Sequence, residues 1–149
     1  MTFTDWNMIA ANTIKLKVDA SSQVYEQVNA FFALIQMSKE NNIVSALIDF
    51  SECEAVPFSR ISQNTALHIA QEMRGCPLHF LALVESRGSR SWWRYIVPSL
   101  RAVDMRAKRF ECSRRAATWL TTRGVYARRP VGRLITPGLS PRPWFTRSR

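Results

Sequence analysis

The chain has 149 residues, of which 46% are hydrophobic and 21% charged, a balance that indicates one globular domain and excludes a largely disordered chain. Its net charge of +10 is unevenly spread, because residues 1–120 hold 14 Lys and Arg against 11 Asp and Glu, whereas residues 121–149 hold seven Arg and no acid. No apolar run approaches the roughly 18 residues that span a membrane, and the N-terminus lacks the basic and apolar regions of a secretory signal, so we expect a cytoplasmic protein without a transmembrane segment.

The first 50 residues show the patterns of strand, helix and strand. Apolar residues alternate with lysines over residues 14–18, which predicts a half-buried strand, and the apolar residues within 1–12 suggest an edge strand beside it. Apolar residues at helical spacing over 24–35 predict an amphipathic helix of roughly four turns, which ends at Asn41-Asn42. The nearly continuous apolar run 43–50 predicts a central strand that is covered on both faces.

The following segment predicts a second helix and another strand. Pro57 interrupts the chain, Ser59 is placed to cap the helix, and Gly75 marks its C-terminal end. The apolar run 78–84 then predicts a second buried strand.

The next part of the chain completes the alternation. Apolar residues keep helical spacing over 92–103, but Pro98 falls inside this pattern and should kink or split the helix. A short strand is expected near 107–111, followed by a last helix that Ser113 caps. This order predicts an α/β fold, with a small, mostly parallel sheet of about four to five strands and about four helices packed on it.

We expect this domain to cover residues 1–122 and an irregular basic tail to cover residues 123–149. The tail holds four prolines, three glycines and seven arginines without a periodic apolar pattern, which is typical of a disordered or loosely attached segment. A non-native extension would have the same texture. Because most of the net charge lies in the tail, the domain itself is predicted to be nearly balanced.

Several segments between Thr13 and Leu120 together resemble a known family. They are Thr13–Val18, Leu47–Ser51, Ala82–Glu85, Lys108–Glu111 and Ala116–Leu120. Their order and spacing resemble a SpoIIAA-like member of the STAS superfamily, whose fold is shared in outline with CRAL-TRIO lipid-transfer domains. The resemblance implies a non-catalytic regulatory or ligand-binding module, which acts through protein contacts or through a small lipid-like or anionic ligand.

The resemblance also points to one serine. Family members of the anti-sigma-antagonist type carry Asp-Ser-Ser-Gly at the start of the second helix, where a partner kinase phosphorylates a serine and the added charge breaks the partner interface. In this chain the position reads Pro57-Phe58-Ser59-Arg60, so the resemblance implies a phosphoswitch only at Ser59. A plain helix cap is the alternative explanation of Ser59.

The loop after the apolar run 78–84 is a candidate binding site for a phosphate or carboxylate. In open α/β sheets, ligands collect beyond the carboxyl ends of the strands and near helix N-termini. The candidate residues combine a glycine, hydroxyl groups and positive charge, and they are Arg87, Gly88, Ser89, Arg90, Ser91 and Arg94. A solvated basic loop without a ligand is the alternative.

Three aromatic residues form a candidate interface. Neighbouring residues of a helix point about 100° apart, so Trp92, Trp93 and Tyr95 cannot all face the core. We expect at least one of them to be exposed or to lie against a protein partner or a second copy of the chain. The alternative is that the sheet edge or the N-terminal segment covers these three side chains.

The residues suited to catalysis or metal binding are few and scattered. Cys53, Cys76 and Cys112 lie far apart without a histidine at ligand spacing, and we expect reduced, mostly buried thiols. His68 and His79 have no recognised nucleophile as a partner. We therefore expect no enzyme, no metal site and no cofactor.

Two other classes of function stay open. A carboxylate cluster at the strand end near Asp49, together with the basic segment 87–94, would suit a small enzyme. The arginine tail, with Tyr126, Trp144 and Phe145, would give non-specific, salt-sensitive contact with nucleic acid or with an acidic membrane surface.

Overall fold

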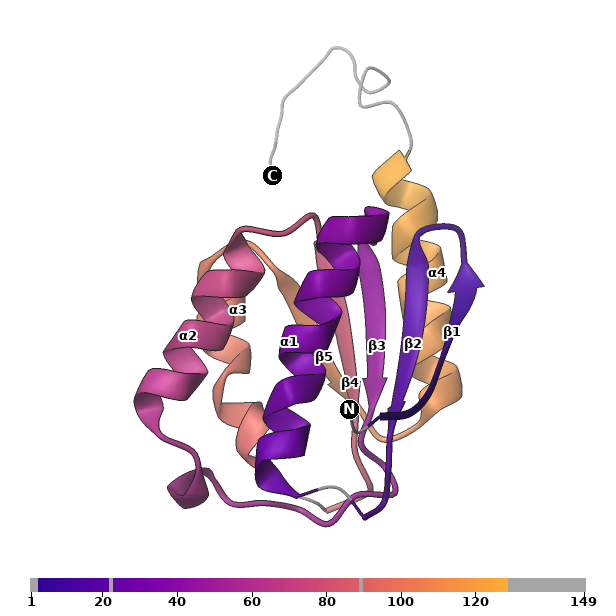
Figure 1. The fold of residues 1–149 in the computed structure, drawn as a ribbon. Coiled ribbons are helices and arrows are strands. Elements are labelled where there is room, and N and C mark those ends of the chain that lie inside the picture. The colour runs from indigo at the N-terminus through magenta and orange to yellow at the C-terminus, as the bar shows by residue number, and fades with distance from the viewer. Residues whose placement is uncertain (1–2, 22, 89, 129–149) are drawn as a thin grey trace.

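The computed structural model describes residues 3–21, 23–88 and 90–128, and within them it shows the predicted α/β architecture (Figure 1). The strands of its single sheet are β1 (Phe3–Ala10), β2 (Thr13–Val18), β3 (Ser45–Asp49), β4 (Phe80–Val84) and β5 (Arg106–Phe110). The α-helices are α1 (Val24–Asn41), α2 (Gln63–Arg74), α3 (Val97–Ala102) and α4 (Ser113–Arg128). Two short 3-10 helices, η1 (Phe58–Arg60) and η2 (Trp92–Tyr95), precede α2 and α3.

The order of the strands in the sheet follows their order in the chain. β1 pairs with β2 in the antiparallel direction, which confirms the edge strand expected within residues 1–12. β2, β3, β4 and β5 pair in parallel, each with the next. β1 and β5 therefore form the two edges of the described sheet, and the four parallel strands end at the same side of it.

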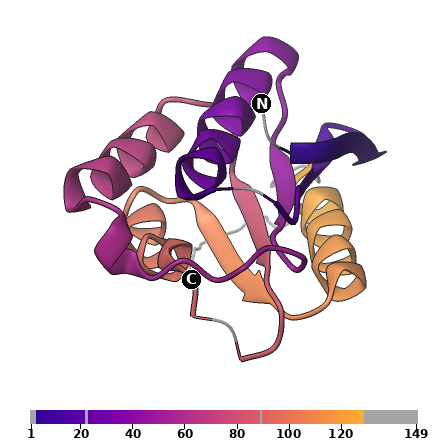
Figure 2. The same cartoon turned by 60° about the horizontal axis from the view of Figure 1, so that its bottom comes forward.

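Helices cover both faces of the sheet. α1, α2 and α3 lie on one face and α4 lies on the other (Figures 1 and 2). Successive side chains of β3 point to opposite faces of the sheet. Ala46 and Ile48 join the larger core on the side of α1, while Leu47 joins the smaller core beneath α4. All five residues of β3 are buried, as the continuous apolar run predicts.

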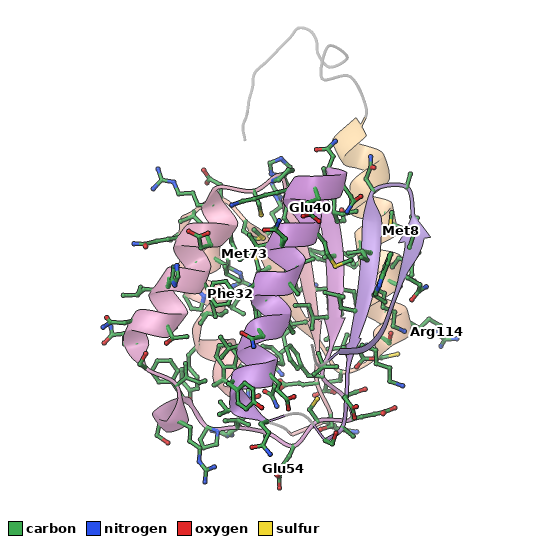
Figure 3. All side chains as sticks on the ribbon, viewed as in Figure 1. Met8, Phe32, Glu40, Glu54, Met73 and Arg114 are labelled. Carbon is green, nitrogen blue, oxygen red and sulfur yellow. The ribbon has the colours of Figure 1, made fainter. Side chains whose placement is uncertain are left out.

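Single residues explain how α1 ends and how it meets α2. Asn42 follows α1 in the left-handed region, with a φ of 53°, and confirms the helix end predicted from the Asn41-Asn42 pair. Phe32 lies between α1 and α2 (Figure 3), where its ring centroid is 5.3 Å from that of His68. Met73 of α2 is fully buried in the larger core, so α2 is held by α1 and α3 as a layer.

The start of α2 differs from the prediction. Ser59 lies in η1, and the residue that caps α2 is Ser62, whose Oγ accepts the backbone N–H of Thr65 at 3.0 Å. Ile61 is the reason for the shift, because its side chain is buried and its backbone is extended, so it separates η1 from α2. The predicted cap at Ser59 is therefore wrong by three residues.

The helix expected over residues 92–103 is split, as Pro98 predicts. η2 ends at Tyr95 and α3 begins at Val97, which places Pro98 in the first turn of α3. An N–H group in that turn has no partner within the helix, so proline costs little there. The split turns η2 inward and leaves α3 as a short helix beside β5.

α4 runs from Ser113 to Arg128 and so crosses residue 122, the expected boundary between the domain and the tail. The boundary itself stays a prediction. Residues 129–149, most of the predicted basic tail, lie outside the described residues.

Candidate anion-binding surface

β5 carries three basic residues along the edge of the sheet. Ala107 of this strand is buried in the larger core, whereas Arg106, Lys108 and Arg109 are exposed. The Nζ of Lys108 lies 5.4 Å from the ring centroid of Phe110. Because no strand follows β5 in the described part of the chain, these cations line an edge rather than the interior of the sheet.

Glu85 brings together two cations at the carboxyl end of β4. Its side chain is buried, and its Oε1 accepts a hydrogen bond from Arg109 Nη1 at 2.8 Å. Arg94 Nε from η2 lies 3.7 Å from the same oxygen. A buried carboxylate is costly unless it is paired, so Glu85 holds the guanidinium groups of Arg94 and Arg109 in one place.

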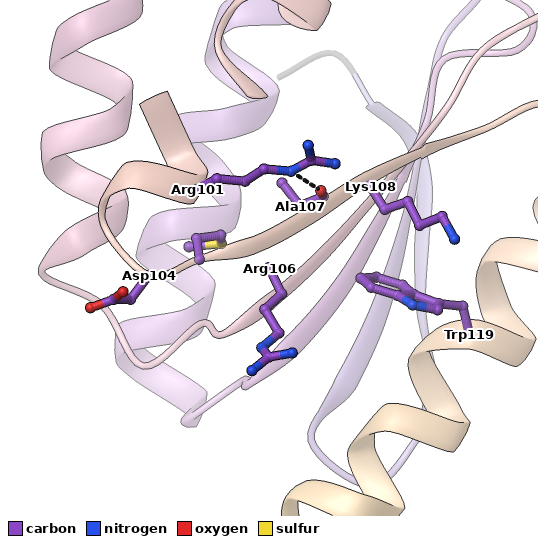
Figure 4. A pocket seen from close by; sticks show the side chains of 7 residues that line it. Arg101, Asp104, Arg106, Ala107, Lys108 and Trp119 are labelled. Carbon is purple, nitrogen blue, oxygen red and sulfur yellow. Dashed lines mark hydrogen bonds between the residues drawn. The ribbon is translucent and has the colours of Figure 1, made fainter. Parts of the chain in front are cut away.

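Arg101 of α3 covers part of the outer edge of β5. Arg106 and Phe110 form backbone hydrogen bonds with the β4 side, so Ala107 between them points its carbonyl outward. Arg101 Nε donates to this carbonyl at 3.1 Å (Figure 4). This hydrogen bond occupies an outward carbonyl of β5 and so disfavours pairing with another strand.

Adjoining hollows surround β5, and basic side chains line each of them. The two larger hollows measure about 700 Å³ and 600 Å³, and the two smaller ones about 340 Å³ and 320 Å³. Neighbouring hollows share Arg94, Arg101, Lys108 or Arg109, so they form one surface, which we call the basic trough. Its cations are Arg87, Arg90, Arg94, Arg101, Arg106, Lys108, Arg109 and Arg115, and its acids are Asp104 and Glu111.

The charge of the domain is distributed less evenly than the sequence prediction implied. Residues 85–120 hold nine Lys and Arg against three Asp and Glu, whereas residues 1–84 hold five against eight. Summing both parts hides this asymmetry and makes the domain look nearly balanced. The basic part folds around β5, so a basic surface belongs to the domain as well as to the tail.

The residues of the predicted anion loop separate in the structure. Arg87 and Arg90 are exposed and line different hollows of the basic trough, and Arg94 lines two of them. Gly88 is exposed with a φ of 79°, a conformation that favours glycine. Ser91 is buried and its Oγ accepts the backbone N–H of Val56 at 3.5 Å, so it is not a surface hydroxyl. Ser89 lies outside the described residues.

Sequence reasoning missed the other half of the basic trough. Arg101, Arg106, Lys108, Arg109 and Arg115 come from α3, β5 and α4 and lie beside the predicted loop only after folding. The excess of cations over residues 85–120 was the available signal. These cations form one surface because β5 lies at the edge of the sheet.

The three aromatic residues of the predicted interface have different environments. Trp92 and Trp93 are fully buried, because η2 turns both indoles into the larger core. Trp92 Nε1 donates to Gln27 Oε1 at 3.1 Å, and the Trp93 ring stacks on Phe50 at a centroid distance of 5.5 Å. Tyr95 is 59% exposed, so it is the residue of the three that is available to a partner.

Ser59 is exposed in η1, so its hydroxyl is accessible from solvent. Phe58 beside it packs on Tyr95 at a centroid distance of 5.3 Å, which places η1 next to one end of the basic trough. The phosphoswitch at Ser59 stays a prediction.

Cys112 differs from the buried thiol that the sequence predicts. It is exposed and directly precedes α4. Ser113 is the first residue of α4, so the prediction that Ser113 caps this helix is wrong. The backbone N–H groups of Arg115 and Arg114 hydrogen-bond to the Cys112 sulfur and lower the pKa of its thiol. Their guanidinium charges act in the same direction.

Cys53 has the opposite environment. It is half-buried near the carboxyl ends of β2 and β3, and its Sγ lies 3.3 Å from the carbonyl oxygen of Asp19. Burial, followed by the negative charges of Asp49, Asp19 and Glu52, raises the pKa of Cys53 to about 11. Cys53 and Cys112 are both free thiols, yet their surroundings shift the thiol pKa in opposite directions.

No group of three or more His, Cys, Asp and Glu side chains within the described residues is arranged to hold a metal ion. His68 and His79 are both exposed. His79 precedes β4, so the prediction that it lies in a buried strand is wrong. None of the described helices combines the length and apolar character needed to cross a membrane.

Comparison with known proteins leaves this surface as the main guide to function. No family model, no curated protein and no solved structure matches the chain. The basic trough and the residues that shape it are therefore the features from which a function can be inferred.

Proposed function

We propose that this chain is a non-catalytic binding module, which holds an anionic ligand or the anionic part of a partner in the basic trough. The observation that carries the proposal is the sharing of Arg94, Arg101, Lys108 and Arg109 between adjoining hollows. Shared cations concentrate positive charge along a concave surface, and such surfaces attract anions and guide their approach.

Glu85 supports the proposal because it fixes two cations before a ligand arrives. Its buried carboxylate holds Arg109 at 2.8 Å and Arg94 at 3.7 Å. Side chains that are already ordered lose less conformational entropy on binding. Guanidinium groups also form paired hydrogen bonds with carboxylates and phosphates, which suits a binding site for either group.

A relation to SpoIIAA-like STAS domains is part of the same proposal. It rests on the mostly parallel sheet with helices packed on it, together with the segments of residues 13–120 that resemble this family. A fold of this kind hosts many functions, so the ligand class is argued from the basic trough and not from the fold.

The proposal is tested with a base-free polyanion and with two triple variants of equal net charge. Arg87→Gln, Arg106→Gln and Lys108→Gln remove three cations of the basic trough. Lys15→Gln, Lys39→Gln and Arg74→Gln remove three cations from β2, α1 and α2. Binding of inorganic polyphosphate to the full-length proteins is measured by isothermal titration calorimetry.

We expect the trough triple variant to bind polyphosphate about 3- to 150-fold more weakly, since each lost contact contributes about 0.2–1 kcal/mol. The control triple variant should bind nearly as well as the unmodified protein. Equal losses in the two triple variants would assign binding to net charge and contradict a role for the trough. Absence of binding by the unmodified protein would contradict the proposal as well.

A further inference from the structure

Two aromatic rings line three linked hollows of the basic trough, one towards each end, and Phe110 lines the fourth hollow. Tyr95 shares the smallest hollow with Arg90 and Arg94. Arg94 also lines the next hollow, which shares Arg101 and Lys108 with the hollow that contains Trp119. A ligand that follows these shared cations from one end to the other therefore meets an aromatic ring at both ends.

The two rings differ in how they are held. Trp119 is partly buried, and its ring lies 5.6 Å from that of Phe110 and 6.2 Å from that of Phe80, so packing fixes its position in the wall of the hollow (Figure 4). Tyr95 is 59% exposed, and Phe58 supports its ring at a centroid distance of 5.3 Å. Tyr95 thus offers a supported and accessible aromatic surface beside arginines.

We propose that the basic trough binds single-stranded nucleic acid, with a base stacked on Tyr95 and the phosphates following Arg94, Arg101 and Lys108. This inference rests on the proposed function and names its ligand class. Proteins that bind single strands combine a positively charged groove with aromatic side chains on which bases stack. Such stacking needs an exposed base face, which a duplex keeps inside its helix.

The other anionic ligands fit fewer of the observations. An acidic peptide or a base-free polyanion would use the cations but would leave the exposed ring of Tyr95 without a role. A small phosphate or carboxylate would occupy one hollow, whereas the shared cations connect several. A ligand with repeating charge and repeating flat rings uses both features.

The experiment measures the fluorescence anisotropy of a labelled thymidine oligonucleotide of about 12 nucleotides, a length within the usual site size for single strands. The same measurement is made with an abasic strand of equal phosphate number and with a duplex of equal length. All proteins are full-length and carry glutamine in place of the seven arginines of residues 121–149, so that tail charge does not contribute.

Three substitutions isolate stacking from charge. Tyr95→Leu removes the ring and keeps apolar bulk against Phe58, and Tyr95→Phe keeps the ring. Tyr25→Leu is the matched control, because Tyr25 is 63% exposed on α1 and lines none of the hollows of the basic trough. All four proteins keep the same net charge.

We expect Tyr95→Leu to weaken binding of the thymidine strand by about 5- to 100-fold, the range for loss of one stacked base, and to leave binding of the abasic strand unchanged. Tyr95→Phe and Tyr25→Leu should bind the thymidine strand as the parent protein does. The duplex should bind equally well to the parent protein and to Tyr95→Leu, because its bases stay stacked inside the helix.

Two results would overturn the inference. Equal binding of the thymidine strand by Tyr95→Leu and Tyr25→Leu would show that Tyr95 does not stack on a base. Equal affinity of the parent protein for thymidine and abasic strands would show that bases are not recognised. In both cases the polyphosphate measurement still decides separately whether the trough binds anions, so the two proposals fail independently.

Discussion

Glu85 divides the cations of the basic trough into two groups with different roles. Arg109 and Arg94 lie beside its buried carboxylate, so removal of Arg109 would leave Arg94 at 3.7 Å as the remaining partner of the buried charge, and should lower stability by about 1–3 kcal/mol. Arg87, Arg106 and Lys108 form no ion pair within the described residues. These three are therefore the residues whose substitution reports on binding rather than on folding.

The contrast between two thiols gives a prediction for single residues. At pH 7.5 we expect iodoacetamide to modify Cys112 well before Cys53, since the thiolate is the reactive form and the pKa of Cys112 is lowered whereas that of Cys53 is raised to about 11. Peptide mass spectrometry over a time course gives both rates in one sample. Faster modification of Cys53 in the folded protein would contradict the environments described here.

The elements show which sequence patterns predict structure and which do not. β2, α1 and β3 follow from local apolar periodicity, because each buries one or both faces along its own length. The segment between β3 and α2 was predicted less well, because Ile61 is buried by contacts with distant residues and moves the helix cap to Ser62. A propensity for capping is present at both serines, and tertiary packing selects one of them.

The corrected start of α2 predicts a difference between two serines. Ser62→Ala should lower the free energy of unfolding by about 1 kcal/mol, because the N–H of Thr65 loses the oxygen that accepts it. Ser59→Ala should change this free energy by less than about 0.5 kcal/mol, as is usual for an exposed site. Urea denaturation followed by circular dichroism compares the two. A larger effect at Ser59 would restore it as the cap.

At the scale of the whole molecule, the site depends on the sheet order. The predicted loop contributed Arg87, Arg90 and Arg94 to the basic trough, but periodicity does not say which strand lies at an edge. Only the sequential order of the strands brings β5 to the margin of the sheet and makes its cations a surface. The contribution of β5 to the site was therefore not predictable from local patterns.

The same arrangement predicts how binding depends on salt. Substitution of Arg87, Arg106 and Lys108 by glutamine should make the dependence of log K on log salt concentration less steep, by about 0.7 for each phosphate contact that is lost with a single strand. Titrations of the thymidine oligonucleotide at several sodium chloride concentrations measure this slope. Substitution of Lys15, Lys39 and Arg74 should leave it unchanged, and an equal change in both variants would argue against a localised surface.

The sequential strand order also has a consequence for folding during synthesis on the ribosome. β1 and β2 form a hairpin from neighbouring residues, and each later strand pairs with the one made just before it, so the sheet grows in the direction of synthesis. The apolar face made by Leu47, Ala82 and Val84 is covered last during synthesis, because α4 covers it and α4 is the last described element to emerge. A nascent chain that stalls before α4 therefore presents a bare apolar surface, which is the form that chaperones bind.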